Sequence, residues 1–507
     1  MAGVCLTLIT ILTSLLLLHT GSSFAAEKSL ADILKEKGIL TEEEYQEAVK
    51  AEEAQKAEEA RKTKETQKAL EETQKALEEA QKAAAVEQKP PSPPAVGYSS
   101  KDGFFLQTPD QKYRLTLQGF VRTQLRLYEN NTSQDNEFKI RHARLILRGY
   151  YGKYWQSEIS AELTMPGGKL IRLADLNCSY LPYLQFQVGQ YKAPFSREFL
   201  IPCWAPDLIE RSMVTDSGGM TPKFDIGVML HSPNAFNGLL WYGVGVFNGA
   251  GDNNGDTNDD KDLVGRVVLA PFALTQMPVL RGFEIGGSFE TGRETADTLG
   301  YYKFQPQLPT FWPFFKEITY RGQRDRYGAE LAYKLGPFKL WSEFIYQSLE
   351  REKQVRVDPA TSEIVNSGGK LIDAPDLIAW GWYVLGTYFV WGDENGGIQL
   401  GARYEQMDVD DKKAPERFRE ANPMGKNSYA NRWGNDLNLR GNTADVLTLG
   451  INYFVNSNVK FSFAWFYQTL DNKFTTDKIE HNHDGGEVFT GGGGVMNACW
   501  LLAQVKW

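Results

Sequence analysis

Hydrophobic and polar positions alternate with a period of two along most of the chain beyond Tyr98. One face of residues 115–128 carries leucine and valine, and the other face carries glutamine and arginine. Residues 281–292 repeat the pattern, with Phe283 and Ile285 opposed to Glu284 and Glu290. Alternation predicts strands whose two faces meet different surroundings. An apolar face and a charged face fit lipid and water, as in a transmembrane barrel.

Sixteen segments carry this pattern, an even number as expected for an outer-membrane barrel. Short connections such as 181–183 and 336–337 alternate with long polar ones such as 193–223 and 409–442. Short turns at one rim and long loops at the other are typical of such barrels. The predicted strands are 115–128, 138–150, 155–165, 171–180, 184–192, 224–231, 239–247, 263–271, 281–292, 324–335, 338–350, 376–391, 396–408, 443–455, 458–470 and 494–507.

In the segment that precedes the predicted barrel, the sequence repeats every seven residues and not every two. The sequence ETQKALE occupies residues 65–71 and again 72–78, and a weaker copy follows at 79–85. Leu70, Leu77 and Ala84 therefore share one seam, which predicts a coiled coil. A solvated single helix and a flexible charged tether stay open as alternatives, because only two leucines occupy the seam.

Local signals set the limits of this stalk. Ser29 to Lys37 predicts a short helix that stops at Gly38. Thr41 and Glu44 have capping-box spacing, with Leu40 and Tyr45 placed as a hydrophobic staple, and the long helix then runs to about Gln88.

The ends of the stalk complete the domain organisation. Residues 1–26 lack charged side chains and hold an apolar run shorter than a spanning helix, which predicts a cleaved signal; a membrane anchor is the alternative. Four prolines follow Lys89 and predict a stiff linker. The predicted organisation is 1–26 signal peptide, 27–88 helical coiled-coil periplasmic segment, 89–109 Pro-rich linker and 110–507 barrel. The fold class is all-β: a 16-stranded antiparallel transmembrane β-barrel preceded by an N-terminal α-helical coiled-coil stalk.

Composition excludes several functions. The formal net charge is −9, and residues 98–507 hold 43 Lys and Arg against 47 Asp and Glu, so the chain is no basic nucleic-acid binder. Three cysteines follow the predicted signal, which makes neither a disulfide framework nor a zinc site. We find no catalytic arrangement and expect no metal and no cofactor.

Positively charged side chains nevertheless concentrate on the predicted inner face. We expect the loop 193–223 to fold inward and narrow the pore. The alternative for each arginine is pairing with a carboxylate on a neighbouring strand. The candidate anion-lining residues are Arg122, Arg126, Arg141, Arg144, Arg148, Lys192, Arg197, Arg211, Lys223, Arg266, Arg326 and Arg403.

Several motifs resemble a known family. GQYKAPFSREFL (189–200), DLIERS (207–212), GVFNGAG (245–251) and LVGR (263–266) are similar to the phosphate-selective porins O and P, and FKIRHARLILRG (138–149) resembles their Arg-rich second strand. The resemblance implies a homotrimer of 16-stranded barrels with an arginine ladder leading to a lysine-lined constriction. Arg141 matches a ladder position. His142 and Phe120 stand where the family has arginine, so selectivity for phosphate itself does not follow.

Together these patterns predict a porin of the bacterial outer membrane, with its stalk in the periplasm. It would contact membrane lipid and let small anions such as phosphate or pyrophosphate diffuse through, and it is not expected to be an enzyme. The alternatives are a general or sugar-type diffusion porin without anion selectivity and a structural outer-membrane tether.

Overall fold

The computed structural model divides into two compact units, residues 1–92 and 93–507, and we describe each by itself. The described residues are 30–39, 41–86, 93–129, 135–165, 170–216, 219–256, 258–294, 300–303, 307–308, 317–357, 370–410, 442–472, 480–481, 487–488 and 494–507. The predicted signal and most of the long loops 409–442 and 471–493 lie outside them.

The first unit is helical. Helix α2 spans Leu30–Glu36 and α3 spans Glu42–Val86, and Gly38 between them has a φ of 70°. The Thr41 amide donates to Glu44 Oε2 at 2.9 Å, and the Glu44 amide donates to Thr41 Oγ1 at 3.5 Å. This reciprocal pair confirms the predicted capping box. The staple cannot be followed, because Leu40 lies outside the described residues.

The heptad seam of α3 is open to solvent in the single chain. Leu70 and Leu77 are 55% and 52% exposed. Ion pairs one helical turn apart, such as Lys56–Glu52 and Lys62–Glu58, support the isolated helix instead. The helix is therefore confirmed, and the coiled coil stays a prediction.

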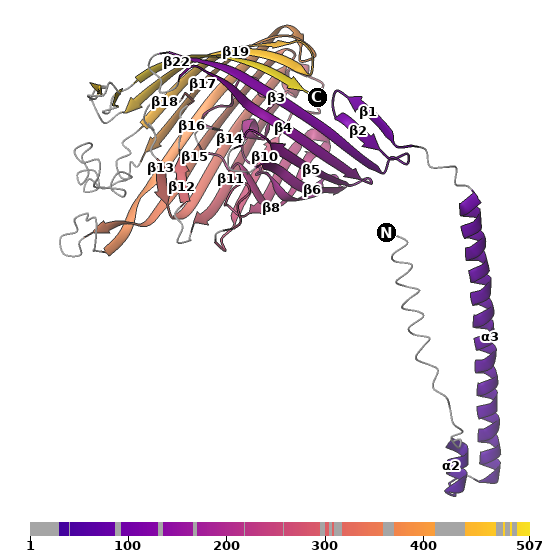
Figure 1. The fold of residues 1–507 in the computed structure, drawn as a ribbon. Coiled ribbons are helices and arrows are strands. Elements are labelled where there is room, and N and C mark those ends of the chain that lie inside the picture. The colour runs from indigo at the N-terminus through magenta and orange to yellow at the C-terminus, as the bar shows by residue number, and fades with distance from the viewer. Residues whose placement is uncertain are drawn as a thin grey trace. The chain divides into compact units, whose positions relative to one another are not determined.

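The second unit is a closed antiparallel barrel (Figure 1). Of the 18 strands in its sheet, sixteen form the ring, and all sixteen predicted strands are among them. Pairing of β22 with β3, from Ala498↔Tyr128 to Lys506↔Phe120, closes the ring. The ring strands are β3 (Tyr113–Tyr128), β4 (Glu137–Tyr151), β5 (Trp155–Glu162), β6 (Ile171–Leu181), β7 (Leu184–Lys192), β8 (Phe224–Ala235), β9 (Leu240–Phe247), β10 (Asp262–Leu269), β11 (Phe283–Glu294), β14 (Gly322–Leu335), β15 (Phe338–Val357), β16 (Lys370–Asp393), β17 (Gly396–Asp410), β18 (Asn442–Phe454), β19 (Val459–Asn472) and β22 (Gly494–Lys506).

The alternation in the sequence matches the two faces of this wall. Along β3, Leu115, Leu117 and Leu127 are exposed on the outside, while Arg122 and Gln124 are buried on the inside. Among the described residues, no helix is both long enough and apolar enough to span a membrane.

Two short strands precede the barrel and were not predicted. Strands β1 (Ala95–Ser99) and β2 (Gly103–Gln107) form a hairpin, and β2 pairs with the part of β3 that β22 leaves free. An ion pair of 2.8 Å between Arg114 and Asp102 joins the hairpin to β3. Each strand is only five residues long, so its alternation is too brief to stand out beside the prolines.

The remaining described elements are short. Helix α4 (Arg197–Leu200), the 3-10 turn η2 (Phe236–Gly238) and helix α5 (Pro278–Arg281) lie in connections. The strand pairs β12–β13 (Gly300–Lys303 and Glu317–Tyr320) and β20–β21 (Glu480–His481 and Glu487–Val488) form separate two-stranded sheets.

Candidate functional site

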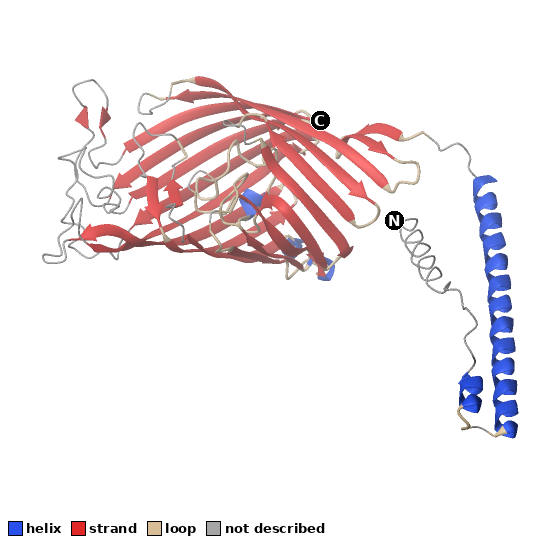
Figure 2. Ribbon diagram, turned by 60° about the horizontal axis from the view of Figure 1, so that its bottom comes forward, coloured by secondary structure: helices blue, strands red, loops and turns tan. Residues whose placement is uncertain are grey.

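The loop 193–223 folds into the barrel, as predicted (Figure 2). Helix α4 lies in this loop, and the Ser196 hydroxyl caps it by accepting the Phe199 amide at 3.2 Å. Met213 and Val214 are fully buried, in one apolar cluster with inward-facing residues of β15 to β22 such as Ile345 and Met407. The loop therefore fills one side of the lumen with an apolar core.

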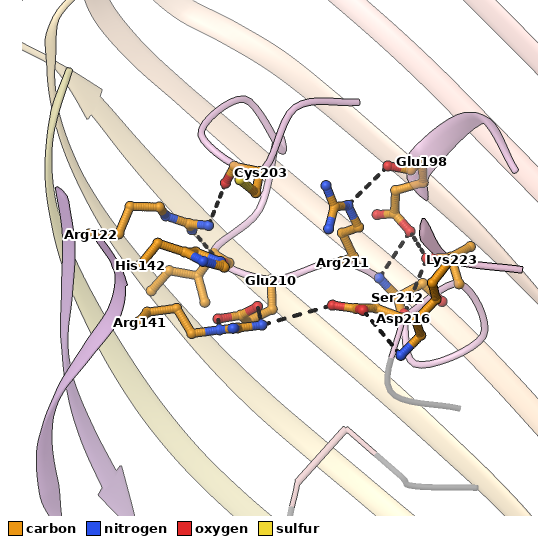
Figure 3. A network of polar contacts seen from close by, with 12 residues as sticks. Arg122, Arg141, His142, Glu198, Cys203, Glu210, Arg211, Ser212, Asp216 and Lys223 are labelled. Carbon is orange, nitrogen blue, oxygen red and sulfur yellow. Dashed lines mark hydrogen bonds and ion pairs between the residues drawn. The ribbon is translucent and has the colours of Figure 1, made fainter. Parts of the chain in front are cut away.

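A β-bulge on β4 turns two consecutive side chains toward the loop. Arg122 pairs with His142 while Thr123 pairs with Ile140, so Arg141 is the extra residue. Arg141 Nε donates to Glu210 at 2.8 Å (Figure 3). His142 Nδ1 lies 2.8 Å from Glu162 on β5. Strict alternation would send one of these two side chains outward, so the sequence pattern alone misses the arrangement.

Two of the predicted pore arginines bind the loop backbone. Arg122 donates through Nη1 to the Cys203 carbonyl and through Nη2 to the Ile209 carbonyl, both at 2.6 Å (Figure 3). Arg403 donates to the carbonyls of Glu210 and Arg211 at 2.9 and 3.2 Å. Each of these arginines is only 1% exposed. Both guanidiniums are anchors of the loop in this structure.

Other candidate arginines pair with carboxylates on the wall. Arg144 lies 3.1 Å from Glu162, and Arg148 lies 2.6 Å from Glu158. The alternative of cross-strand pairing therefore holds for most of the predicted ladder. The other pairs within the wall are Arg126 with Glu137, Arg266 with Glu330, and Arg326 with Glu290. Pairs between the wall and the loop are Arg126 with Glu210, and Arg197 with Glu284 and Glu330.

The remaining candidates gather at one edge of the loop. Lys192 Nζ and Arg211 Nη2 both donate to the Ile201 carbonyl, at 2.9 and 2.6 Å. Among the described residues, no carboxylate oxygen lies within 4 Å of either cation. Lys192 Nζ also donates to the Phe199 and Leu200 carbonyls, at 2.6 and 3.3 Å, and Arg211 Nε donates to the Glu198 carbonyl at 3.0 Å. Backbone oxygens, and not carboxylates, therefore surround both side chains.

The same edge holds a looser ionic group. Asp216 lies 3.8 Å from both Arg141 and Lys223, and the Lys223 side chain is 48% exposed (Figure 3). We call Arg141, Lys192, Arg211, Asp216 and Lys223 the loop cluster. It carries four cations against one carboxylate of its own, and Arg141 also pairs with Glu210.

Carboxylates fix the conformation of the loop. Glu198 accepts the Ser212 amide at 2.9 Å and the Thr215 hydroxyl at 2.6 Å, and Glu405 on β17 accepts the Met213 amide at 2.7 Å. Glu343 on β15 accepts the amides of Arg197 and Glu198 at 3.0 and 2.8 Å. Glu343 is not among the predicted site residues, although its inward position follows from the alternation of 338–350.

The described residues contain no group of three His, Cys, Asp or Glu side chains that could hold a metal ion. Their cysteines, Cys178, Cys203 and Cys499, form no disulfide.

Solved structures similar to this chain include an outer membrane protein, an anion-selective porin and an outer membrane channel. The trimer form of OmpT from Vibrio cholerae is 13% identical, covers 78% of this chain and 99% of its own, and has a TM-score of 0.48. An anion-selective porin from Comamonas acidovorans is 12% identical over 78% and 100% of the two chains, with a TM-score of 0.45. The channel DcaP from Acinetobacter baumannii is 14% identical; the match covers 79% of this chain and 99% of DcaP, with a TM-score of 0.44.

No curated protein sequence matches the chain significantly. The family profile described as phosphate-selective porin O and P, in contrast, matches residues 112–483, which is most of the chain and nearly all of the barrel. With sixteen strands closed into a ring and a loop folded into the bore, the chain belongs to the phosphate-selective porins O and P and is a porin of the bacterial outer membrane.

Proposed function

We propose that small anions cross the barrel along β4, between this strand and the edge of the loop 193–223. The observation that carries the proposal is the charge of the loop cluster. Lys192 and Arg211 share the Ile201 carbonyl as a hydrogen-bond acceptor, without a carboxylate within 4 Å among the described residues. The side chains of Lys223 and Arg141 are 48% and 29% exposed.

The energetics favour weak and reversible binding. An anion about 4 Å from one cation gains roughly 1 kcal/mol in bulk water and about 4 kcal/mol at an effective dielectric constant of about 20. Conduction requires binding strong enough for entry and weak enough for release. Glu210 and Asp216 reduce the net positive charge beside Arg141. These carboxylates keep an anion from being trapped.

The arginines that anchor the loop act indirectly in this proposal. Arg122 and Arg403 hold the loop against the wall and so set the width of the path. Arg144, Arg148, Arg266 and Arg326 form a neutralised polar wall with their carboxylates. The solute class is small anions; phosphate and pyrophosphate are candidates within it.

Single-channel recording in planar bilayers tests the path. The reversal potential in a salt gradient should show anion preference, and Arg211→Gln or Lys223→Gln should reduce it. Lys153→Gln is the matched control, because Lys153 is an exposed cation in the short turn between β4 and β5. Cation preference of the unmodified protein would contradict the proposal. Equal permeability for both signs would favour a general diffusion porin, and absence of conductance would favour a tether.

We also propose that α3 assembles with identical copies into a homotrimeric coiled coil. The support is the seven-residue spacing of Leu70 and Leu77, both about half exposed in the single chain. Leu70→Gln with Leu77→Gln should lower the temperature at which the oligomer dissociates on semi-native gels. Lys68→Gln with Lys75→Gln, on the opposite side of the heptad, serves as control. Equal dissociation temperatures for all three proteins would refute the coiled coil.

A further inference from the structure

One turn at the periplasmic rim is unlike its neighbours. The connection between β10 and β11 runs from Ala270 to Gly282, whereas 336–337 and 394–395 at the same rim have two residues each. Its sequence, PFALTQMPVL over 271–280, contains no charged residue. Periplasmic turns of outer-membrane barrels are ordinarily short, so the length and composition of this one call for a physical reason.

The turn has a defined structure. Helix α5 forms its second half, and the Leu280 and Arg281 amides donate to the Met277 carbonyl at 3.1 and 3.3 Å. The Arg281 guanidinium crosses the turn and donates twice to the Thr275 carbonyl, at 3.2 and 2.9 Å. These hydrogen bonds hold the backbone of residues 275–281 in a defined conformation.

Two contacts place the turn against the outer face of the barrel. The Tyr333 hydroxyl on β14 donates to the Val279 carbonyl at 2.8 Å, and the rings of Phe272 and Phe283 lie 6.0 Å apart. Tyr333 and Phe283 are register partners on β14 and β11. Both alternate with inward-facing residues such as Glu330 and Glu284, so they belong to the outward face. The turn thus lies on the membrane side of the wall and not across the lumen.

Apolar side chains on this turn point away from the protein. Leu274, Met277 and Val279 are 58%, 61% and 57% exposed, and Phe272 and Leu280 are also exposed. A contiguous exposed apolar patch on an ordered segment marks an interaction surface. We call residues 272–280 the apolar turn.

The occupant of this surface follows from what adjoins it. Exposed Leu269 on β10 and Ile285 on β11 flank the turn and belong to the apolar outer wall that faces lipid. The surface of the turn continues that wall toward the periplasm. Arg281 follows the apolar turn directly, and among the described residues it has no carboxylate partner within 4 Å. An apolar surface that ends in a cation matches the acyl chains and phosphates of a phospholipid leaflet.

We propose that the apolar turn inserts into the periplasmic leaflet of the outer membrane. Its apolar side chains contact acyl chains, and Arg281 lies at the level of the lipid phosphates. The turn fixes the depth of the barrel wall at β10 and β11, where the other periplasmic turns end at the membrane surface. This inference depends on the barrel crossing the membrane and not on which solute it conducts.

Fluorescence quenching in nanodiscs tests the insertion. Full-length protein in which all four cysteines, Cys5, Cys178, Cys203 and Cys499, are replaced by Ala receives one new cysteine, Leu274→Cys or Met277→Cys, labelled with bimane. Asn395→Cys is the matched control, because Asn395 is exposed in the short turn between β16 and β17 at the same rim. The nanodiscs contain phosphatidylethanolamine and phosphatidylglycerol, with a spin label on the acyl chain near the headgroup as one quencher and iodide in water as the other.

Labels at Leu274 and Met277 should be quenched several-fold more by the lipid spin label than the label at Asn395, and several-fold less by iodide. Heat-modifiable gel mobility selects protein with a folded barrel. Equal iodide quenching at all three positions would overturn the proposal, because the turn would then lie in water. Protection from both quenchers would also overturn it, because a protein partner or another copy of the chain would then cover the turn.

Discussion

Arg122 distinguishes two roles for a buried arginine in a pore. As a step of an anion ladder, its charge would act on the solute. As an anchor, its two hydrogen bonds to the Cys203 and Ile209 carbonyls would hold the constriction loop in place. Its 1% exposure and the absence of open contact with solvent favour the anchor. The substitution Arg122→Met keeps the length of the side chain and removes both bonds.

The expected magnitude comes from those two bonds. A hydrogen bond from a charged donor contributes about 1.5–3 kcal/mol, and each buried carbonyl left without a donor costs about 1–3 kcal/mol. Two such bonds at 2.6 Å therefore hold the loop by roughly 3–6 kcal/mol. That energy is enough to loosen the stretch around Cys203 and Ile209, while Arg403, Glu343 and Glu405 still hold the rest of the loop. Arg122→Lys keeps the charge but has no forked pair of donors. It should therefore lose about half of the stabilisation that Arg122 gives to the loop.

Single-channel recording separates the two roles. If Arg122 anchors the loop, Arg122→Met raises the conductance and the current noise, because the stretch around Cys203 and Ile209 is held less firmly in the lumen. Faster proteolysis within 193–223 should accompany this change. If Arg122 is a ladder residue, Arg122→Met lowers anion selectivity at unchanged or lower conductance and leaves proteolysis as it was. That second outcome would refute the anchoring argument.

Three further changes test other parts of the structure. Gly189→Ala should destabilise the barrel by about 1–3 kcal/mol, because Gly189 has a φ of 128° and a Cβ there would collide with the Ala174 carbonyl; heat-modifiable gel mobility measures the loss, and equal stability would contradict it. Ser212→Ala removes the hydroxyl that donates to Glu405, so the loop should be cleaved faster by protease while the barrel keeps its melting temperature. The Thr41 amide and hydroxyl hold the pKa of the Glu44 carboxyl below its ordinary 4.5. This group therefore stabilises the start of α3 at pH values above 4.5 and loses its effect as the pH falls through the lowered pKa, so acid should reduce helical circular dichroism less in Glu44→Gln than in the unmodified protein.

The barrel could be predicted from the sequence because lipid on one side of the wall and polar surroundings on the other impose an alternating pattern on the strands. Lipid outside and polar surroundings inside force alternation on every long strand, and all sixteen ring strands were identified from it. The same reasoning missed the β1–β2 hairpin, whose strands are too short to show a period. It also could not foresee the bulge at Arg141, which breaks the period at one residue.

The candidate site shows a second limit. Alternation places Arg122 and Arg403 on the inner face, but it does not say whether a solute, a carboxylate or a loop carbonyl will meet them. Those contacts depend on how residues 193–223 cross the lumen, which is a long-range packing outcome. Lys192 and Arg211 were identified as cations of the constriction. No sequence pattern indicates that both side chains bind the Ile201 carbonyl, because every residue has a backbone carbonyl.

Closure of the ring by β22 and β3 bears on how the protein reaches its native state. The Thr123 hydroxyl and its acceptor, the Ala503 carbonyl, are 380 residues apart in the chain, so this seam has a very high contact order. Strand β3 emerges early in synthesis and must stay unpaired along one edge until β22 arrives. An unpaired edge of that length invites aggregation during the delay. We therefore expect the rate of maturation to be governed by this last pairing, and the unfolded polypeptide to need protection from aggregation until the pairing forms.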